Sequence, residues 1–137
     1  MNPLDQSEVQ VRVRYAECDP MGLLHHAKYF EYLELSRTEL LRASGVSYRE
    51  LEARGVFFVV AKLEIRYKAP IRYDDVVIIH TRVERITRTR VDHSYRMLVN
   101  GVVCTEASST LACVDTSGRP ILMPENLWPD DPTEPRP

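Results

Sequence analysis

Hydrophobic and polar residues alternate at the start of the chain and then change to a helical spacing. Residues 9–15 (VQVRVRY) alternate with period two, which predicts a β-strand with one buried face. In residues 27–44 the apolar side chains, Tyr29 and Leu33 among them, recur near one face of a helix, and charged side chains fall on the other. Gly45 follows directly and is a typical helix stop. The pattern therefore predicts one strand followed by one long helix.

The rest of the chain has mainly the spacing of β-strands. Residues 47–51 first predict a short helix, because Ser47 and Glu50 form a capping box. Beyond Gly55 the segments are either continuously apolar or alternate between apolar and polar residues. Asn100-Gly101 lies between the last two segments and is a strong signal of a two-residue hairpin. The predicted strands are 56–69, 76–86, 91–99 and 102–114.

This order of elements indicates an α+β fold, in which one long helix covers one face of a five-stranded antiparallel sheet. We expect one domain over residues 9–124, after an N-terminal extension (1–8) and before a Pro-rich C-terminal tail (125–137). A single helix covers only one face, and an open sheet has edge strands that need cover. We therefore expect at least a homodimer.

Composition narrows the class of protein. The 137 residues fit one domain, and 44% hydrophobic with 28% charged residues is typical of a soluble globular protein. A net charge of −2 argues against nucleic acid as the main partner. The three cysteines include no C-x-x-C pair, which favours free thiols in a reducing compartment. With no secretory signal and no membrane-spanning apolar run, we expect a cytoplasmic protein without integral membrane association.

The segment between the predicted strand and the long helix carries the most chemistry. Asp19-Pro-Met-Gly22 has the residues of a turn, and residues 22–28 offer no Ser, Thr, Asp or Asn as a helix cap. Uncapped N–H groups at a helix start favour a negatively charged ligand. The short loop can bring Tyr15, Asp19 and His26 together. Such a site suits carbonyl chemistry, because the N–H groups hold an oxyanion while the carboxylate attacks or activates water.

Each candidate also has a purely structural interpretation, which the pattern leaves open. The segment can be an ordinary turn, and Cys18 can be a buried thiol rather than a nucleophile. His80 and His93 are isolated, so we predict no metal site, and no cofactor motif is present. Arg88 and Arg90 belong to a solvated turn or to a phosphate-binding patch.

The segment YAECDPMGLLHHAKY (residues 15–29) resembles the active-site segment of hotdog-fold acyl-CoA thioesterases. These belong to the 4-hydroxybenzoyl-CoA thioesterase family, and the similarity is strongest to its Tol-Pal-associated (YbgC-type) branch. Residues 59–70, Asp74-Asp75 and 119–124 add to a resemblance that covers 9–124. It implies a hotdog fold, homodimers and often homotetramers with active sites at the subunit interface, an acyl-CoA substrate and no cofactor.

The resemblance also implies roles for individual residues. The acidic nucleophile or general base of the family falls on Asp19, and the helix-start N–H that polarises the thioester carbonyl falls on His26. His25 is a departure, since relatives often carry an aromatic or aliphatic residue there. The remaining expected site residues are Tyr15 beside the acid, Gly22 near the substrate, and Arg88 and Arg90 at the coenzyme A phosphates.

We therefore expect hydrolysis of an acyl-CoA thioester to a carboxylic acid and coenzyme A. One alternative is a hotdog hydratase or dehydratase, which needs a His and a second acidic residue in a different motif. The other alternative is a non-catalytic module that binds acyl-CoA.

Overall fold

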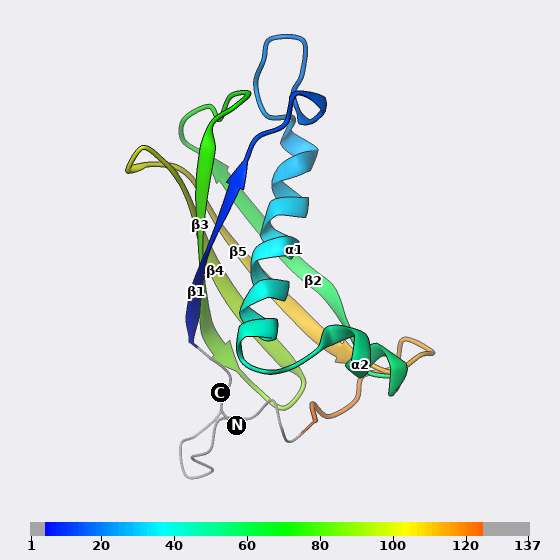
Figure 1. Cartoon of the computed structure of the whole chain (residues 1–137). Coiled ribbons are helices and arrows are strands. Elements are labelled where there is room, and N and C mark those ends of the chain that lie inside the picture. Colours follow the sequence, from blue (N-terminus) through cyan, green and yellow to red (C-terminus); the bar gives the residue numbers. More distant parts are fainter. Residues whose placement is uncertain (1–4, 125–137) are drawn as a thin grey trace.

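A single five-stranded antiparallel sheet forms the frame of the protein, seen in a computed structural model that describes residues 5–124 (Figure 1). The strands lie in the order β1-β3-β4-β5-β2, so β1 and β2 are the two edges. The α+β layout and the five strands predicted from the sequence are confirmed. The strands are β1 (Gln6–Arg12), β2 (Phe57–Tyr67), β3 (Val76–Ile86), β4 (Arg90–Val99) and β5 (Val102–Val114).

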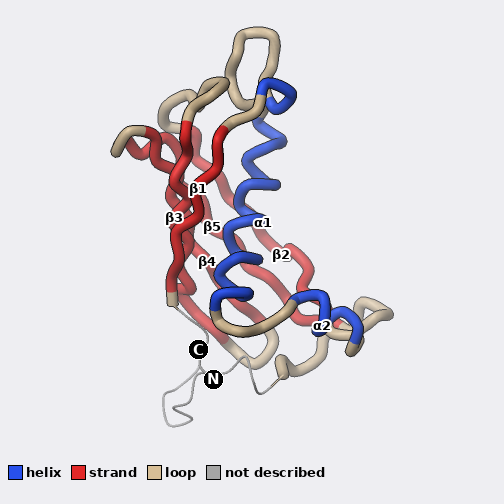
Figure 2. The backbone as a smooth tube through the Cα atoms, viewed as in Figure 1, coloured by secondary structure: helices blue, strands red, loops and turns tan. Residues whose placement is uncertain are grey.

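One long helix crosses one face of this sheet, as Figure 2 shows. Helix α1 (His26–Ala43) lies within one residue of its predicted bounds at each end, and Gly45 beyond it has the positive φ of +85° expected at a helix stop. The short helix α2 (Tyr48–Ala53) is capped by the Ser47 hydroxyl, which accepts from the N–H of Glu50. No helix within residues 5–124 is both long enough and apolar enough to cross a membrane.

The first predicted strand has different bounds in the structure. Strand β1 begins at Gln6, and residues Tyr15–Glu17 form a turn of 3-10 helix, η1, rather than the end of the strand. The alternation in the sequence continues to Tyr15, but pairing with β3 ends at Arg12, which lies opposite Val76. The Pro-rich tail expected at 125–137 lies outside the described residues.

The apolar core lies between α1 and the sheet and falls into two clusters. The larger holds the completely buried Leu33 of α1 against Ile79 of β3 and Met97 of β4. A smaller one, around Leu51 of α2 and Cys113 of β5, lies near the end of α1. Burial of each large apolar side chain contributes about 1.5–3 kcal/mol, so the helix is held mainly by its apolar face.

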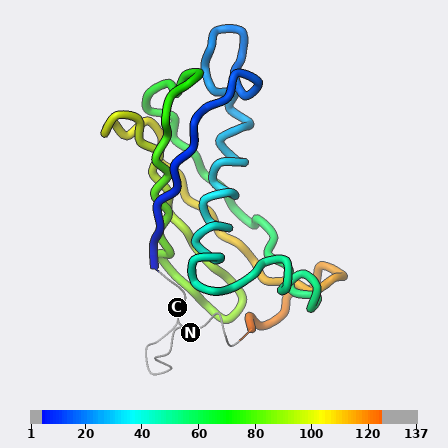
Figure 3. The backbone as a smooth tube through the Cα atoms, viewed as in Figure 1, coloured from blue at the N-terminus to red at the C-terminus, as the bar shows by residue number. Residues whose placement is uncertain are grey.

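The direction of the strands separates two ends of the molecule. The loop from β1 into α1 lies beside the start of β3, because Arg12 pairs with Val76. The turn between β3 and β4 lies at the other end of β3, whose 11 residues span about 35 Å. Figure 3 shows the loop and this turn at opposite ends of the chain trace. We call them the loop end, around residues 13–25, and the α2 end, around α2 and residues 86–90.

Candidate active site

The loop that carries the predicted site is tied to the segment between β2 and β3. The N–H of Leu24 donates to the carbonyl of Ile71 at 2.7 Å, and the N–H of Tyr73 donates to the carbonyl of Gly22 at 3.0 Å. The N–H of Asp74 donates to the carbonyl of Val13 at 3.1 Å. These bonds fix the loop on both sides of Asp19, so its position relative to the start of α1 is set by backbone.

Asp19 uses one carboxylate oxygen to hold the loop. Its Oδ1 accepts hydrogen bonds from the N–H groups of Met21, at 2.9 Å, and Leu23, at 3.1 Å. The predicted turn is confirmed, because the N–H of Gly22 donates to the carbonyl of Asp19 at 2.9 Å, and Gly22 has a φ of +78° that favours glycine. The second oxygen, Oδ2, has no hydrogen-bond partner among residues 5–124. The carboxylate therefore has a structural role and still has an oxygen available for chemistry.

The start of α1 corrects one prediction. The sequence predicts an uncapped helix, but His25 is the cap, since its ring Nδ1 accepts from the N–H of Ala27 at 3.2 Å. Histidine is not among the usual capping residues, which is why the pattern missed it. The N–H of His26, at the first helical position, has no partner in the part of the chain that the structure describes. Of the N–H groups expected to be open at the helix start, that of Ala27 is therefore occupied, and that of His26 remains for a ligand.

The three side chains expected to act together are not joined by hydrogen bonds within residues 5–124. Tyr15 is 79% exposed, and its ring packs edge-on against Tyr73 with centroids 5.4 Å apart. The ring of His26 stacks on that of His25 at 4.3 Å. The loop therefore gathers Tyr15, Asp19 and His26 at one end of the molecule, with two rings turned toward solvent.

Glu17 is a residue of this loop that the sequence pattern did not single out. Its buried Oε1 accepts from the backbone N–H of Arg14 at 2.9 Å and from the hydroxyl of Tyr32, on α1, at 2.8 Å. Burial acts to raise the pKa of Glu17, but these hydrogen bonds outweigh it and hold the pKa below its usual value. The carboxylate is therefore ionised at neutral pH and links the loop to the helix. The signal in the sequence was Tyr32, a polar-tipped residue on the predicted apolar face.

Cys18 is a partly buried thiol that packs against the larger apolar cluster. Burial, together with the charges of Asp19 and Glu17, raises the pKa of its thiol above the usual value, which disfavours the thiolate. Among residues 5–124 no group of three His, Cys, Asp or Glu side chains is arranged to hold a metal ion.

Arg88 and Arg90 lie at the α2 end, far from Asp19 within one chain. Arg90 begins β4, and the carbonyl of Arg88 accepts from the N–H of Met123 at 2.6 Å. A polar hollow of about 270 Å³ beside them is lined by Arg85, Arg90 and Asp92, with Thr87 and Thr89. The chain brings Gly22 next to Asp19, but it does not bring the two arginines there.

The comparisons with known proteins agree with this fold. Residues 13–129 match the model of the thioesterase-like superfamily. The chain is 34% identical over 119 residues to the acyl-CoA thioester hydrolase YbgC of Escherichia coli, covering 85% of this chain and 89% of the relative. It is 30% identical over 119 residues to the acyl-CoA thioesterase YbgC of Haemophilus influenzae, covering 85% and 88%.

A solved structure is also similar to this chain, in both fold and sequence. The DHNA-CoA thioesterase of Staphylococcus aureus superposes with a TM-score of 0.83 at 31% identity, covering 89% of this chain and 81% of that one. The chain therefore belongs to the thioesterase-like superfamily and has its hotdog fold. It is an enzyme of the thioester hydrolase class.

Proposed function

We propose that the protein hydrolyses acyl-CoA thioesters to a free carboxylic acid and coenzyme A at the loop end. The observation that carries this proposal is that two groups at the loop end are both available among residues 5–124: one carboxylate oxygen of Asp19 and the N–H of His26. Asp19 lies on a loop whose backbone is tied to the neighbouring segment, and His26 is the first residue of the helix that follows this loop. The names of the relatives above support the same substrate class.

The chemistry follows from these two groups. The thioester carbonyl oxygen accepts from the His26 N–H, where the positive end of the α1 dipole stabilises the developing oxyanion. Asp19 then either attacks the carbonyl carbon, giving an anhydride that water hydrolyses, or takes a proton from an attacking water. Either route breaks the carbon–sulfur bond and releases coenzyme A. The exposed rings of Tyr15 and His26 are proposed to position the carboxylate or the water, with Gly22 beside the substrate.

The test is a panel of acyl-CoA esters, with short aliphatic, long-chain and aromatic acyl groups, incubated with wild-type protein. We expect release of a free thiol, measured with a thiol-reactive dye, from at least one class. Hydration of an enoyl-CoA without thiol release would instead favour the hydratase alternative. Tight binding of the esters without turnover would favour the non-catalytic module.

We further propose that the working enzyme is a homodimer or a homotetramer, because a site that uses both Asp19 and the coenzyme A contacts of Arg88 and Arg90 needs two chains. Strand β2 is an edge of the sheet, and it exposes the apolar Val59 and Val60. Pairing of two β2 edges about a two-fold axis is antiparallel. Antiparallel pairing sets the loop end of one protomer beside the α2 end of the next.

Sedimentation at micromolar concentration should give a dimer or a tetramer for the wild type. Val60→Lys should shift the protein toward monomer and lower its turnover, because the charge disfavours edge pairing. Val102→Lys is a matched control, since Val102 is also an exposed apolar residue but lies beside the β4–β5 turn. A wild-type monomer with full activity would contradict this proposal.

A further inference from the structure

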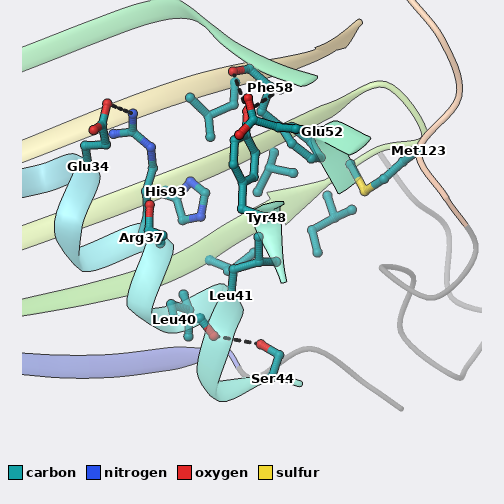
Figure 4. Close-up of a pocket in the computed structure, with 15 residues that line it drawn as sticks. Glu34, Arg37, Leu40, Leu41, Ser44, Tyr48, Glu52, Phe58, His93 and Met123 are labelled. Carbon is teal, nitrogen blue, oxygen red and sulfur yellow. Dashed lines mark hydrogen bonds and ion pairs between the residues drawn. The ribbon is translucent and has the colours of Figure 1, made fainter. Parts of the chain in front are cut away.

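A pocket of about 420 Å³ lies at the α2 end, between the second half of α1, α2 and the sheet (Figure 4). This volume falls within the range of about 300–1,000 Å³ typical of small-molecule sites. Its walls are mainly apolar and include Leu40 and Leu41 of α1, Phe58 of β2, and Val91 and Leu111 of β4 and β5. Within one chain it lies at the opposite end of α1 from Asp19, and none of the residues assigned above to the reaction lines it.

A poorly paired cation lies in this pocket. The side chain of Arg37 is only 14% exposed, and its ion pair with Glu34 is long, at 3.9 Å. The Glu34 side chain is itself 73% exposed, so the solvent weakens this ion pair, which is the dashed line between the two residues in Figure 4. A guanidinium removed from water needs close anionic or hydrogen-bonding partners, and this pair supplies little compensation. Arg37 is therefore available to an anion that enters the pocket.

A buried histidine lies next to it. His93 of β4 is 7% exposed, and its Nδ1 has no hydrogen-bond partner among residues 5–124. Burial lowers the pKa of His93 to about 4, with a further contribution from the charge of Arg37 that outweighs the opposing effect of Asp92. The ring is thus neutral at pH 7, and it offers one hydrogen bond rather than a charge.

The remaining polar groups limit what the pocket can take. The Tyr48 hydroxyl is already occupied, since it accepts from the N–H of Phe58 at 2.9 Å and donates to its carbonyl at 3.3 Å. Glu34 and Glu52 also line the pocket, so a ligand with several negative charges would meet repulsion. Thr38 and Ser44 line it as well, and the Ser44 hydroxyl donates to the carbonyl of Leu40 at 2.8 Å. A single cation, the neutral ring of His93 and mainly apolar walls fit a ligand with one negative charge and an apolar body.

We propose that this pocket binds an apolar monocarboxylic acid, aliphatic or aromatic, with its carboxylate between Arg37 and His93. The guanidinium of Arg37 donates to the carboxylate oxygens, and the Nδ1–H tautomer of His93 donates to one of them. The hydrocarbon part lies against Leu41, Phe58 and Val91. Such acids are of the kind that the proposed reaction releases, but binding here does not depend on that reaction.

The test is isothermal titration calorimetry of the full-length protein with octanoate and with 2-naphthoate, and with 1-octanol as the neutral analogue. We expect both acids to bind and the alcohol to bind at least ten-fold more weakly. Arg37→Gln should weaken acid binding by roughly ten- to a hundred-fold, because a hydrogen bond to a charged group is lost. His93→Phe keeps the ring shape and should weaken it by roughly two- to ten-fold.

Arg42→Gln is the matched control. Arg42 is on the same helix and also pairs with a glutamate three residues earlier, Glu39, but its side chain is exposed. This variant should bind the acids as the wild type does. Asp19→Asn should also retain binding, which separates this site from the proposed catalytic one and makes the two proposals fail independently. Thermal melting checks that each variant is folded, and a folded Arg37→Gln protein with wild-type affinity would overturn the proposal.

Other occupants of the pocket give different results. Acid binding that appears only after residues 125–137 are removed would mean that this segment fills the pocket, and the proposal would be wrong. Affinity that falls as protein concentration rises would mean that a second copy fills it, which would also overturn the proposal. Equal affinity for octanoate and 1-octanol would remove the assigned role of Arg37.

Discussion

Asp19→Asn should lower the turnover of the best acyl-CoA substrate by roughly 10²–10⁴-fold, the range typical of losing a catalytic acid or base. The substitution is chosen to spare the loop. An asparagine Oδ1 can still accept from the N–H groups of Met21 and Leu23, which the Asp19 Oδ1 accepts from now. What the variant loses is the negative charge and the second carboxylate oxygen. Thiol release under saturating substrate measures the effect.

The chain offers a close control for this experiment. Asp115 holds a turn in the same way, because its Oδ1 accepts from the N–H groups of Ser117, at 2.9 Å, and Arg119, at 3.0 Å. Asp115→Asn should therefore leave turnover nearly unchanged. The same variant measures how much the same chemical change lowers stability in a similar turn. If Asp19→Asn keeps near wild-type turnover and remains folded, Asp19 is a structural residue only, and the proposed mechanism is wrong.

His26→Pro should lower turnover by roughly 10²–10³-fold, the loss typical of removing one oxyanion-binding N–H. Proline has no N–H, and it is well tolerated at the first position of a helix. His25, the preceding residue, already has φ −62° and ψ 135°, which is the conformation that a following proline requires. The variant therefore removes the proposed oxyanion donor with little change to α1, and its effect is measured with the same thiol assay.

A second variant at His26 distinguishes the role of its ring from the role of its backbone N–H. His26→Ala removes the exposed ring, which stacks on His25, but keeps the backbone donor. If the N–H carries the effect, His26→Ala should retain far more activity than His26→Pro. Equal losses in the two variants would assign the role to the imidazole and would contradict the proposed use of the helix start.

Much of the fold was predictable because its signals are local. Alternation of apolar residues predicted the strands, and the helical spacing from Tyr29 predicted α1. Asn100-Gly101 predicted the β4–β5 hairpin. The turn at Asp19 followed from its Asp, Pro and Gly residues. These signals depend on neighbours within a few residues, so the sequence carries them directly. The observed bounds of an element differ from the predicted ones where pairing with a neighbouring strand sets them, as at the two ends of β1.

The details of the site were harder to predict from the sequence. The cap by His25 depends on one ring torsion, which no spacing reports. The link from Glu17 to Tyr32 joins a loop to a helix, and its partners are far apart in the sequence. Arg37 could have been noticed, because a position four residues after Leu33 lies on the apolar face of α1. A charged residue on a buried face is an informative exception.

The sequence by itself determined the order of the five strands and the two α-helices, the turn at Asp19, and the family resemblance of residues 15–29, but not the 3-10 helix η1. Only the tertiary structure decided which groups lie together. Antiparallel pairing of β3 with β1 and β4 sends Arg88 and Arg90 to the end of the sheet opposite Asp19. Packing of α1 on the sheet brings Arg37 to the pocket that His93 of β4 also lines. The reason is physical: local patterns fix backbone conformation, whereas contacts between distant residues depend on how the elements pack.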